Sequence, residues 1–314
     1  MKMIECYEPD FVRTFLSHHP GSPLHVRRAW QSEIRHSLTL TDADSCEAAL
    51  GAPHAFTLHV SECAALPDGQ PLSRRDRALN QAALNAVTLP GLSPELRLYA
   101  LGILLSYSEK VPGDSEDVLA HIASLSDTLA NLTREGKLQQ QFALLPAVPQ
   151  LPCRLITLLG GLDFDWGKLP DSARKASLPL QVSLLMLQDA SSEALLQQQL
   201  HTQWQATHER YFADEAWIFS NYLIYRLYHD MFPQHDGEGV TGCYFALVSD
   251  VFLIRTLFSL WTLDGSPLTP ADTSALFALF ERWRHGESAA ALRLQVQSLL
   301  PADYLLSAFS LLIS

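Results

Sequence analysis

The stretch Cys243–Leu263, CYFALVSDVFLIRTLFSLWTL, is the longest apolar run in the sequence. Its length approaches that of a membrane span, but Asp250 and Arg255 lie near its middle, where charges are costly in a bilayer. We therefore interpret residues 240–263 as a buried helix at the centre of a large helical core. No membrane partner is expected.

Helical signals continue on both sides of this stretch, whereas few segments alternate apolar and polar residues at period two. Residues 93–95, Ser-Pro-Glu, supply an N-cap, a first-turn proline and a first-turn acid for a helix that runs to about residue 110. Asp114 with Asp117 resembles the capping box of a second helix, which ends near Gly136. The two helices are expected to pack as an antiparallel hairpin. The predicted fold class is all-α and multi-helical.

The remaining helices are expected at residues 74–88, 138–146, 151–160, 171–188, 192–232, 240–263, 270–285, 288–299 and 302–312. Three prolines in Leu144–Cys153, LLPAVPQLPC, predict a linker between two lobes. The expected division is an irregular N-terminal segment over 1–72, a helical lobe over 73–146 and a second lobe over 154–314. Within the first segment, residues 54–63 are compatible with one short strand or with irregular structure.

Charge and cysteine usage narrow the class of protein. The sequence has 34 acidic and 22 basic residues, a formal charge of −12, and no run of Lys or Arg, which argues against a nucleic-acid partner. The scattered cysteines contain no C-x-x-C pair and indicate reduced, mostly buried thiols. They are Cys6, Cys46, Cys63, Cys153 and Cys243. The beginning, MKMIECYEPDF, does not resemble a signal peptide, so a cytoplasmic location is expected.

The segment 220–242, SNYLIYRLYHDMFPQHDGEGVTG, contains unusually many polar groups for a buried helix. On a helical wheel, the apolar arc is an ordinary core stripe of Trp217, Leu223, Ile224, Leu227 and Met231. The opposite arc is polar and aromatic, and it holds Asn221, Tyr222, Tyr225, Arg226, Tyr228 and His229.

Two interpretations of the polar arc stay open at this point. The helix could be wedged between two neighbours, with its tyrosines and its arginine bonded to groups of adjacent elements. Alternatively, the arc could form the polar-aromatic wall of a ligand or peptide pocket.

Glycines 237, 239 and 242 match G-x-G-x-x-G, but they follow a helix, so a dinucleotide fold is not indicated. Gly239 and Gly242 could expose backbone N–H groups to a carboxylate or phosphate at the start of the 240–263 helix, or form a simple turn. Arg255 projects about 140° away from Asp250 on this helix and needs another acceptor, for which the tyrosine face is a candidate.

No other catalytic or metal motif is evident in the sequence. It contains no G-x-S-x-G, H-E-x-x-H or P-loop pattern. His18, His19 and His25 lie in a turn-rich stretch without a cysteine at ligand spacing, so no metal site is expected.

Several segments in order resemble the flagellin lysine-N-methylase family. They are EPDFVRTF, DADSCEAALGAPHAFTLHV, LPGLSPELRLYALGILLSYSEK, NYLIYRLYHDMFP and YFALVSDVFLIRTLFSLW. The resemblance implies methylation of lysine ε-amines on flagellin, with S-adenosylmethionine as the methyl donor.

For that chemistry, we assign roles to individual residues from their residue types. Asn221, Tyr222 and Tyr225 would orient the lysine, and Arg226 or Arg255 would bind the carboxylate of the donor. The expected binding set also includes three further residues, His229, Gly239 and Gly242.

The family also carries an N-terminal cysteine-rich region thought to hold an iron-sulfur cluster. Here the corresponding positions fall near Ser17, Ser22, Val26 and Arg27, none of which is a thiolate ligand. The cluster site is degenerate, and no cluster is expected.

Three hypotheses follow. The chain is a flagellin lysine methylase, a catalytically degenerate paralogue that binds flagellin or another protein as an adaptor or regulator, or an unrelated helical scaffold. Binding of S-adenosylmethionine separates the first from the second.

Overall fold

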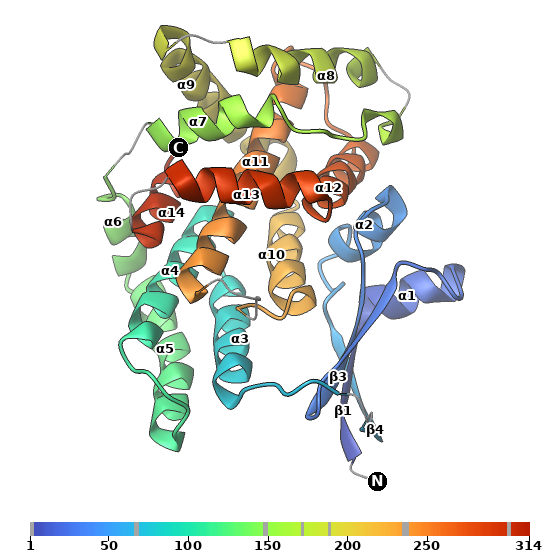
Figure 1. The fold of residues 1–314 in the computed structure, drawn as a ribbon, viewed down its shortest axis with the longest axis vertical. Coiled ribbons are helices and arrows are strands. Elements are labelled where there is room, and N and C mark those ends of the chain that lie inside the picture. The colour runs from blue at the N-terminus through green and yellow to red at the C-terminus, as the bar shows by residue number, and fades with distance from the viewer. Residues whose placement is uncertain are drawn as a thin grey trace. The chain divides into compact units, whose positions relative to one another are not determined.

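The computed structural model describes residues 3–65, 69–146, 150–170, 173–187, 190–233, 239–299 and 303–314. The chain forms two compact units. Unit 1 comprises Met1–Glu135 and Trp217–Gly237, and unit 2 comprises Gly136–Ala216 and Glu238–Ser314. Most of the described residues are helical, but the N-terminal part contains a four-stranded sheet (Figure 1). The all-α prediction is therefore wrong in this part, and the described residues of the segment 1–72, which was predicted to be irregular, contain regular strands and helices.

Unit 1 is built on a mixed sheet with the strand order β2-β3-β1-β4. β1 pairs in parallel with β3 and antiparallel with β4, and β2 pairs antiparallel with β3. The strands are β1 (Met3–Pro9), β2 (His25–Ala29), β3 (Glu33–Leu38) and β4 (Leu58–Ala64). β4 confirms the strand alternative for residues 54–63. The helices of unit 1 are α1 (Asp10–His18), α2 (Ala43–Leu50), α3 (Arg74–Val87), α4 (Pro94–Glu109), α5 (Glu116–Arg134) and α10 (Trp217–His229).

The inner strand β3 shows why the sequence pattern does not predict the sheet. Ile34 and Leu38 are fully buried on one face, as in an ordinary strand. The residues that alternate with them, Glu33, Arg35 and Ser37, are also buried, on the opposite face. Because these inward-facing residues are polar, an apolar-polar alternation does not mark the strand.

Local signals predicted the helices of unit 1 better than its sheet. The side chains of Ser73 and Ser93 cap α3 and α4 by accepting the backbone N–H three residues later. α5 begins at Glu116, one residue later than predicted, because Ser115 rather than Asp114 is the N-cap. α4 and α5 pack on each other and both pack on α3, as Figure 1 shows.

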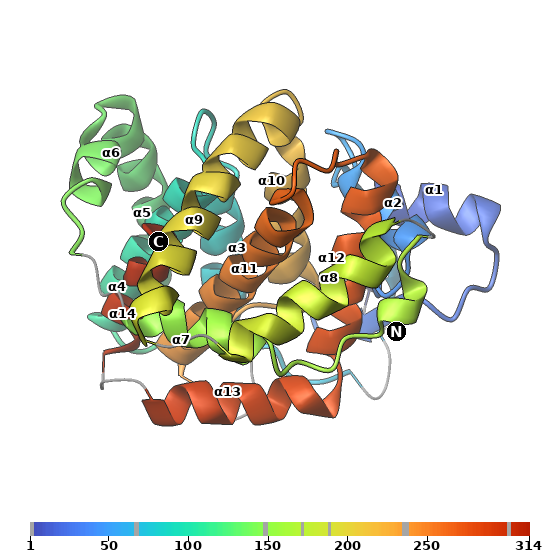
Figure 2. The ribbon, with the colours of Figure 1, turned by 90° about the horizontal axis from the view of Figure 1, so that it is seen from above.

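Unit 2 is organised around α11 (Val240–Thr262), which contacts helices from both of its chain segments (Figure 2). By length and composition, α11 could span a membrane, but 94% of its apolar window is buried, as in a core helix. The buried helix predicted at 240–263 is confirmed. The other elements are α6 (Lys137–Phe142), α7 (Gln150–Leu159), η1 (Trp166–Lys168), α8 (Ala173–Leu184), η2 (Leu185–Leu187), α9 (Ala190–Thr207), η3 (His208–Phe212), α12 (Pro270–Arg284), α13 (Glu287–Leu299) and α14 (Tyr304–Leu312).

The long helix predicted at 192–232 is divided. α9 continues into one π-helical turn, η3, and residues 213–216 form turns before α10 begins. The chain passes from unit 2 to unit 1 at this break, so α10 joins the N-terminal residues rather than the lobe predicted over 154–314. Part of the predicted linker, residues 147–149, lies outside the described residues, and Pro152 lies in the first turn of α7, where proline is tolerated.

The thiols give a test of the strand register. All five cysteines are free; Cys46, Cys153 and Cys243 are buried, whereas Cys6 and Cys63 are partly exposed. Ile4 pairs with Cys63 and Cys6 with Ser61, so the two exposed thiols are diagonal neighbours on one face. Burial, and next the neighbouring Cys63, raises the pKa of the Cys6 thiol.

We expect iodoacetamide to alkylate the two exposed thiols of the native protein first. Because the thiolate is the reactive form, the rate at Cys6 should still increase as the pH rises above the usual titration range of a thiol. Peptide mass spectrometry after timed quenching measures each site. Labelling of the buried Cys46 as fast as Cys63 would contradict this arrangement.

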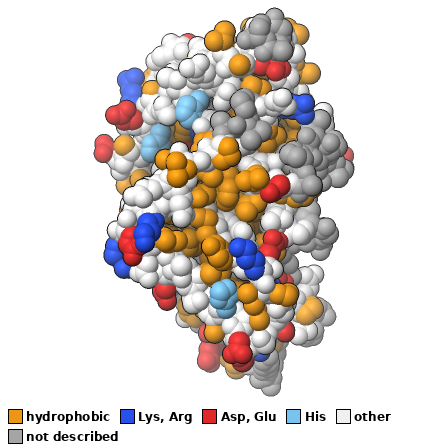
Figure 3. All heavy atoms as spheres, turned by 90° about the vertical axis from the view of Figure 1, so that its left-hand side faces the viewer, with side chains coloured by type: hydrophobic (Ala, Val, Ile, Leu, Met, Phe, Trp, Pro, Cys, Tyr) orange, Lys and Arg blue, Asp and Glu red, His pale blue; other side chains and the backbone are white. Residues whose placement is uncertain are grey.

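Charged side chains are interspersed on the molecular face in Figure 3. The Lys and Arg side chains visible there lie singly or beside Asp and Glu. Among the side chains that the figure describes on this face, no continuous basic surface is available to follow a phosphate backbone.

Candidate functional site

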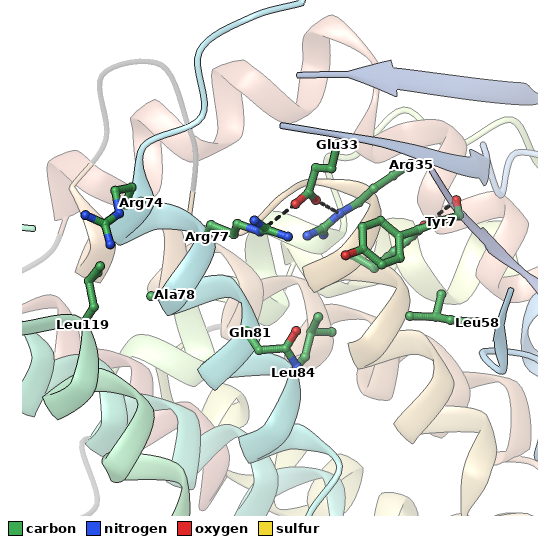
Figure 4. A pocket seen from close by; sticks show the side chains of 11 residues that line it. Tyr7, Glu33, Arg35, Leu58, Arg74, Arg77, Ala78, Gln81, Leu84 and Leu119 are labelled. Atoms are coloured by element: carbon green, nitrogen blue, oxygen red, sulfur yellow. Dashed lines mark hydrogen bonds and ion pairs between the residues drawn. The ribbon is translucent and has the colours of Figure 1, made fainter. Parts of the chain in front are cut away.

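Two elements of unit 1 carry charged side chains at spacings that bring them together. In β3, Glu33 and Arg35 are two residues apart, so both lie on the same face of the sheet. In α3, Arg74, Arg77 and Gln81 recur at intervals of three and four residues and share one side of the helix. Figure 4 shows Arg77 projecting from α3 toward Glu33 on β3.

The centre of this group is the Glu33 carboxylate, which is fully buried. Its Oε1 accepts a hydrogen bond of 2.6 Å from Nε of Arg35, and its Oε2 lies 2.9 Å from Nε of Arg77. Nη2 of Arg77 donates to Glu5 at 3.0 Å. Burial disfavours the charged guanidinium of Arg77, but Glu33, Tyr7 and Glu5 outweigh it and raise its pKa. A buried carboxylate needs such pairing, and two guanidiniums provide it.

Asn80 connects this charge pair to the end of α10. Nη1 of Arg35 donates to Oδ1 of Asn80 at 2.9 Å. The Asn80 amide then donates to the backbone oxygens of Leu227, at 2.8 Å, and Phe232, at 2.7 Å. The Arg35 guanidinium also lies 5.0 Å from the centre of the Tyr228 ring. Strand β3, helix α3 and helix α10 are therefore joined through one arginine.

Two phenols adjoin the charged group. The Tyr228 hydroxyl donates to the backbone oxygen of Tyr7 at 3.1 Å, and the Tyr7 hydroxyl donates to the Glu5 carboxylate. Burial raises the pKa of Tyr228 far above its usual value, although Arg35 opposes the shift. Burial and the hydrogen bond to Glu5 likewise raise the pKa of Tyr7. Both phenols stay protonated at neutral pH, so they can donate hydrogen bonds but do not act as bases.

These groups border a cavity of about 450 Å³, which we call the Glu33 cavity (Figure 4). Its lining consists of Tyr7, Glu33, Arg35, Leu58, Arg74, Arg77, Ala78, Gln81, Leu84, Leu119 and Tyr228. Tyr7, Glu33 and Arg35 line it from the sheet. The helices contribute polar side chains, among them Arg74 and Arg77, and also an apolar part made by Ala78, Leu84 and Leu119. Its size lies in the range of small-molecule sites.

The polar arc predicted on α10 is held by partners within unit 1. Nδ2 of Asn221 donates to the backbone oxygen of Ala52 at 2.8 Å. The Tyr222 hydroxyl accepts a bond of 3.0 Å from Arg226, whose Nε lies 3.1 Å from the Asp230 carboxylate.

The two remaining residues of the arc that have a predicted role, Tyr225 and His229, also have partners. Tyr225 stacks on His229 with ring centres 4.8 Å apart, and Nδ1 of His229 lies 2.9 Å from the Ser37 hydroxyl. α10 packs against α2 and α3, and its one residue on the Glu33 cavity is Tyr228. These contacts agree with the interpretation of a helix wedged between neighbours. The catalytic and binding roles assigned to the five residues stay predictions.

The remaining predicted residues belong to unit 2. Gly239 is the N-cap of α11 and Gly242 is buried within it, whereas Gly237 lies outside the described residues. Nη2 of Arg255 donates to the backbone oxygen of Ser314 at 2.9 Å, and its guanidinium lies 5.2 Å from the centre of the Trp204 ring. Arg255 thus has partners inside its own unit, and its predicted role toward a methyl donor stays untested.

The sequence offered weak signals for the Glu33 cavity. The tripeptide Glu33-Ile34-Arg35 has the spacing of a strand with a charged face, and Arg77 and Gln81 share a face of the predicted helix 74–88. Nothing in either segment shows that the two faces meet. The sequence places Tyr228 in the polar arc of α10, but it does not predict that Tyr228 lines the cavity.

The described residues do not bring potential metal ligands together. Within these ranges, no group of three or more His, Cys, Asp or Glu side chains is placed to hold a metal ion. His25 and His36 form a pair, with Nε2 and Nδ1 2.9 Å apart, and burial lowers the pKa of His36.

Comparison with known protein families then identifies the chain. Residues 80–293 match the model of the FliB lysine N-methylase C-terminal domain, which is more than half of the 314 residues. The chain belongs to the FliB lysine N-methylase family. No curated protein and no solved structure matches it.

The FliB match divides the lining of the Glu33 cavity. Gln81, Leu84, Leu119 and Tyr228 lie within the matched range. The matched range begins at Asn80. The other lining residues, including all the charged ones, precede Asn80 and lie outside the match. The family domain therefore supplies most of α3, together with α5 and α10, while the sheet that completes the cavity comes from residues outside the match.

Proposed function

We propose that this member of the FliB lysine N-methylase family transfers methyl groups from S-adenosylmethionine to lysine ε-amines of flagellin in the cytoplasm. The family match over residues 80–293 carries the proposal, because that family is named for lysine N-methylation. The Glu33 cavity supports it, because it combines the volume of a small-molecule site with groups of both charges.

The lining chemistry fits the methyl donor. The amino-acid end of S-adenosylmethionine is a zwitterion, and the cavity lining offers the guanidiniums of Arg35 and Arg77 together with the carboxylate of Glu33. The Gln81 amide has one donor and one acceptor side, as the edge of an adenine requires. Ala78, Leu84 and Leu119 supply an apolar surface for the adenine ring.

When bound, the donor supplies an electrophilic methyl group: the amine lone pair forms the C–N bond, the C–S bond breaks with its electrons to sulfur, and the ammonium product loses a proton. The residues of this chain bind and orient. Arg77 would hold the carboxylate, while Glu33 keeps Arg35 and Arg77 in place. The neutral hydroxyls of Tyr7 and Tyr228 are hydrogen-bonding groups for an ε-amine.

The proposal includes no iron-sulfur cluster. A cluster of this kind needs four ligands, usually cysteine thiolates. Cys6 and Cys63 are the neighbouring thiols on the sheet of unit 1, and the described residues contain no larger cluster of potential ligands. No step is assigned to a cluster.

The intact mass of flagellin tests the proposal. Flagellin is co-expressed with and without the protein in a host that has no other flagellin methylase. We expect mass increases by whole methyl groups that require the protein. Arg77→Gln should reduce the fraction methylated at early times about tenfold, because it removes a charged hydrogen-bond donor. The matched control is Arg134→Gln, an exposed arginine on α5.

An unchanged flagellin mass would contradict the methylase proposal. If flagellin were still captured by the protein without added S-adenosylmethionine, the adaptor or regulator hypothesis would replace it. Isothermal titration with S-adenosylmethionine separates a protein that binds the donor from one that does not.

A further inference from the structure

The outer edge of β4 is open. Among the described strands, β4 pairs with β1 alone and stands at the end of the sheet. An unpaired edge presents a row of N–H and C=O groups that another extended chain can bond. β2, at the opposite end, carries the charged residues Arg27 and Arg28, which disfavour such pairing.

β4 carries two exposed apolar side chains on one of its faces. Leu58 is 45% exposed and Val60 is 58% exposed. The register pairs Val60 with Tyr7 and Leu58 with Pro9, so these side chains share the face that carries Tyr7. Leu58 also lines the Glu33 cavity. An exposed apolar strip therefore runs from the open edge to the cavity.

A row of carboxylates crosses the sheet beside this strip. Glu62 of β4 is paired with Glu5 of β1, which is paired with Glu33 of β3. Glu33 and Glu5 share Arg77, whereas Glu62 is exposed at the edge. The open end of the row is acidic and complements a cationic side chain.

We propose that β4 receives an extended segment of the substrate protein as a fifth strand, with a lysine directed across Glu62 toward the Glu33 cavity. Its backbone would bond the free edge, and its apolar side chains would cover Leu58 and Val60. The lysine part of the proposal rests on the proposed methylase function; the strand docking does not.

Sheet dimensions place the lysine over β4. Neighbouring strands lie about 4.8 Å apart, so an extended lysine side chain on the added strand spans one spacing, to Glu62 of β4, and does not span the second spacing to β1. The long aliphatic stem of lysine can lie along Val60 while the ammonium remains near Glu62. Alternate residues of a strand face one side, so the partner should carry apolar residues two positions from the lysine.

The test uses the full-length protein and a fluorescent twelve-residue peptide of alternating valine and threonine with one central lysine. Binding is measured by anisotropy without S-adenosylmethionine, and hydrogen exchange locates the site. We expect slower exchange in 58–64. Two further peptides are each N-methylated at two alternate amides, so that one hydrogen-bonding edge of the peptide is blocked in each. Only the peptide whose blocked edge faces β4 should lose affinity, on the order of tenfold.

Protein variants test the side chains. Glu62→Lys should weaken binding about fivefold in low salt and less in high salt, whereas the exposed control Glu47→Lys should not. Val60→Lys should weaken binding more than Leu144→Lys, which changes an apolar residue that is 83% exposed in unit 2. A peptide with glutamate in place of lysine should bind worst.

Binding that leaves exchange in 58–64 unchanged, or that is unaffected by N-methylation at both edges, would overturn the docking proposal. Equal binding of the lysine and glutamate peptides would overturn the lysine assignment. Because no methyl donor is present, failure of flagellin methylation leaves this result intact, and failure of docking leaves the flagellin mass assay intact.

Discussion

Arg35→Met is expected to reduce the free energy of unfolding by about 3 kcal/mol, because it leaves the fully buried Glu33 carboxylate with one half-exposed partner. The Arg35 side chain is 10% exposed, so little water is available to replace it. The substitution also removes the bond to Asn80, which holds the end of α10.

Urea denaturation followed by tryptophan fluorescence measures this loss. The matched control is Arg74→Met on the same cavity, whose partner Glu116 is 81% exposed and whose solvent-exposed ion pair should contribute little to stability. The double variant Glu33→Gln, Arg35→Met should recover part of the loss, because no unpaired charge is buried. Equal losses for Arg35→Met and Arg74→Met would show that the buried pair does not stabilise unit 1.

Ala78→Phe is expected to have the largest effect on function. Ala78 lines the Glu33 cavity from α3, and a phenyl ring there would occupy the apolar side that we assign to adenine. Overfilling a site typically costs about 2 kcal/mol, which corresponds to roughly a thirtyfold loss of affinity for S-adenosylmethionine. Flagellin methylation at limiting donor should fall in proportion.

Isothermal titration and the flagellin mass assay measure the two effects. Ala123→Phe, an exposed position on α5, makes the same change of residue type without entering the cavity. Thermal unfolding of both variants establishes that they are folded. If Ala78→Phe bound the donor as well as the wild-type protein, the donor site would lie outside the Glu33 cavity, and the predicted residues Arg226 and Arg255 would be tested next.

Residue patterns alone predicted a large part of the helical structure. α11 is apolar on all sides, and a sequence of that kind has to be buried whatever surrounds it. The cap of α4 at Ser93 and that of α12 at Thr269, where Asp272 completes a capping box, act within four residues. Such signals require no knowledge of the rest of the chain.

The sheet and the cavity depend on contacts that the sequence does not display. Arg77 is paired with Glu33, 44 residues earlier in the chain, and Asn80 with Leu227, 147 residues later. Tyr222, Tyr225 and His229 suggested a pocket wall because their side chains are polar, but each has a partner inside unit 1. Which polar residue faces a cavity and which one fills the core depends on its distant neighbours.

The sequence by itself determined the positions of most helices, the burial of α11 and the resemblance to the lysine methylase family, since each depends on local order along the chain. Only the tertiary structure decided that β3 is a strand, that Glu33 is shared by two arginines, and that β4 has an open edge. The physical reason is that a charged side chain is buried only where its partners already are, and here those partners come from elements far apart in the sequence.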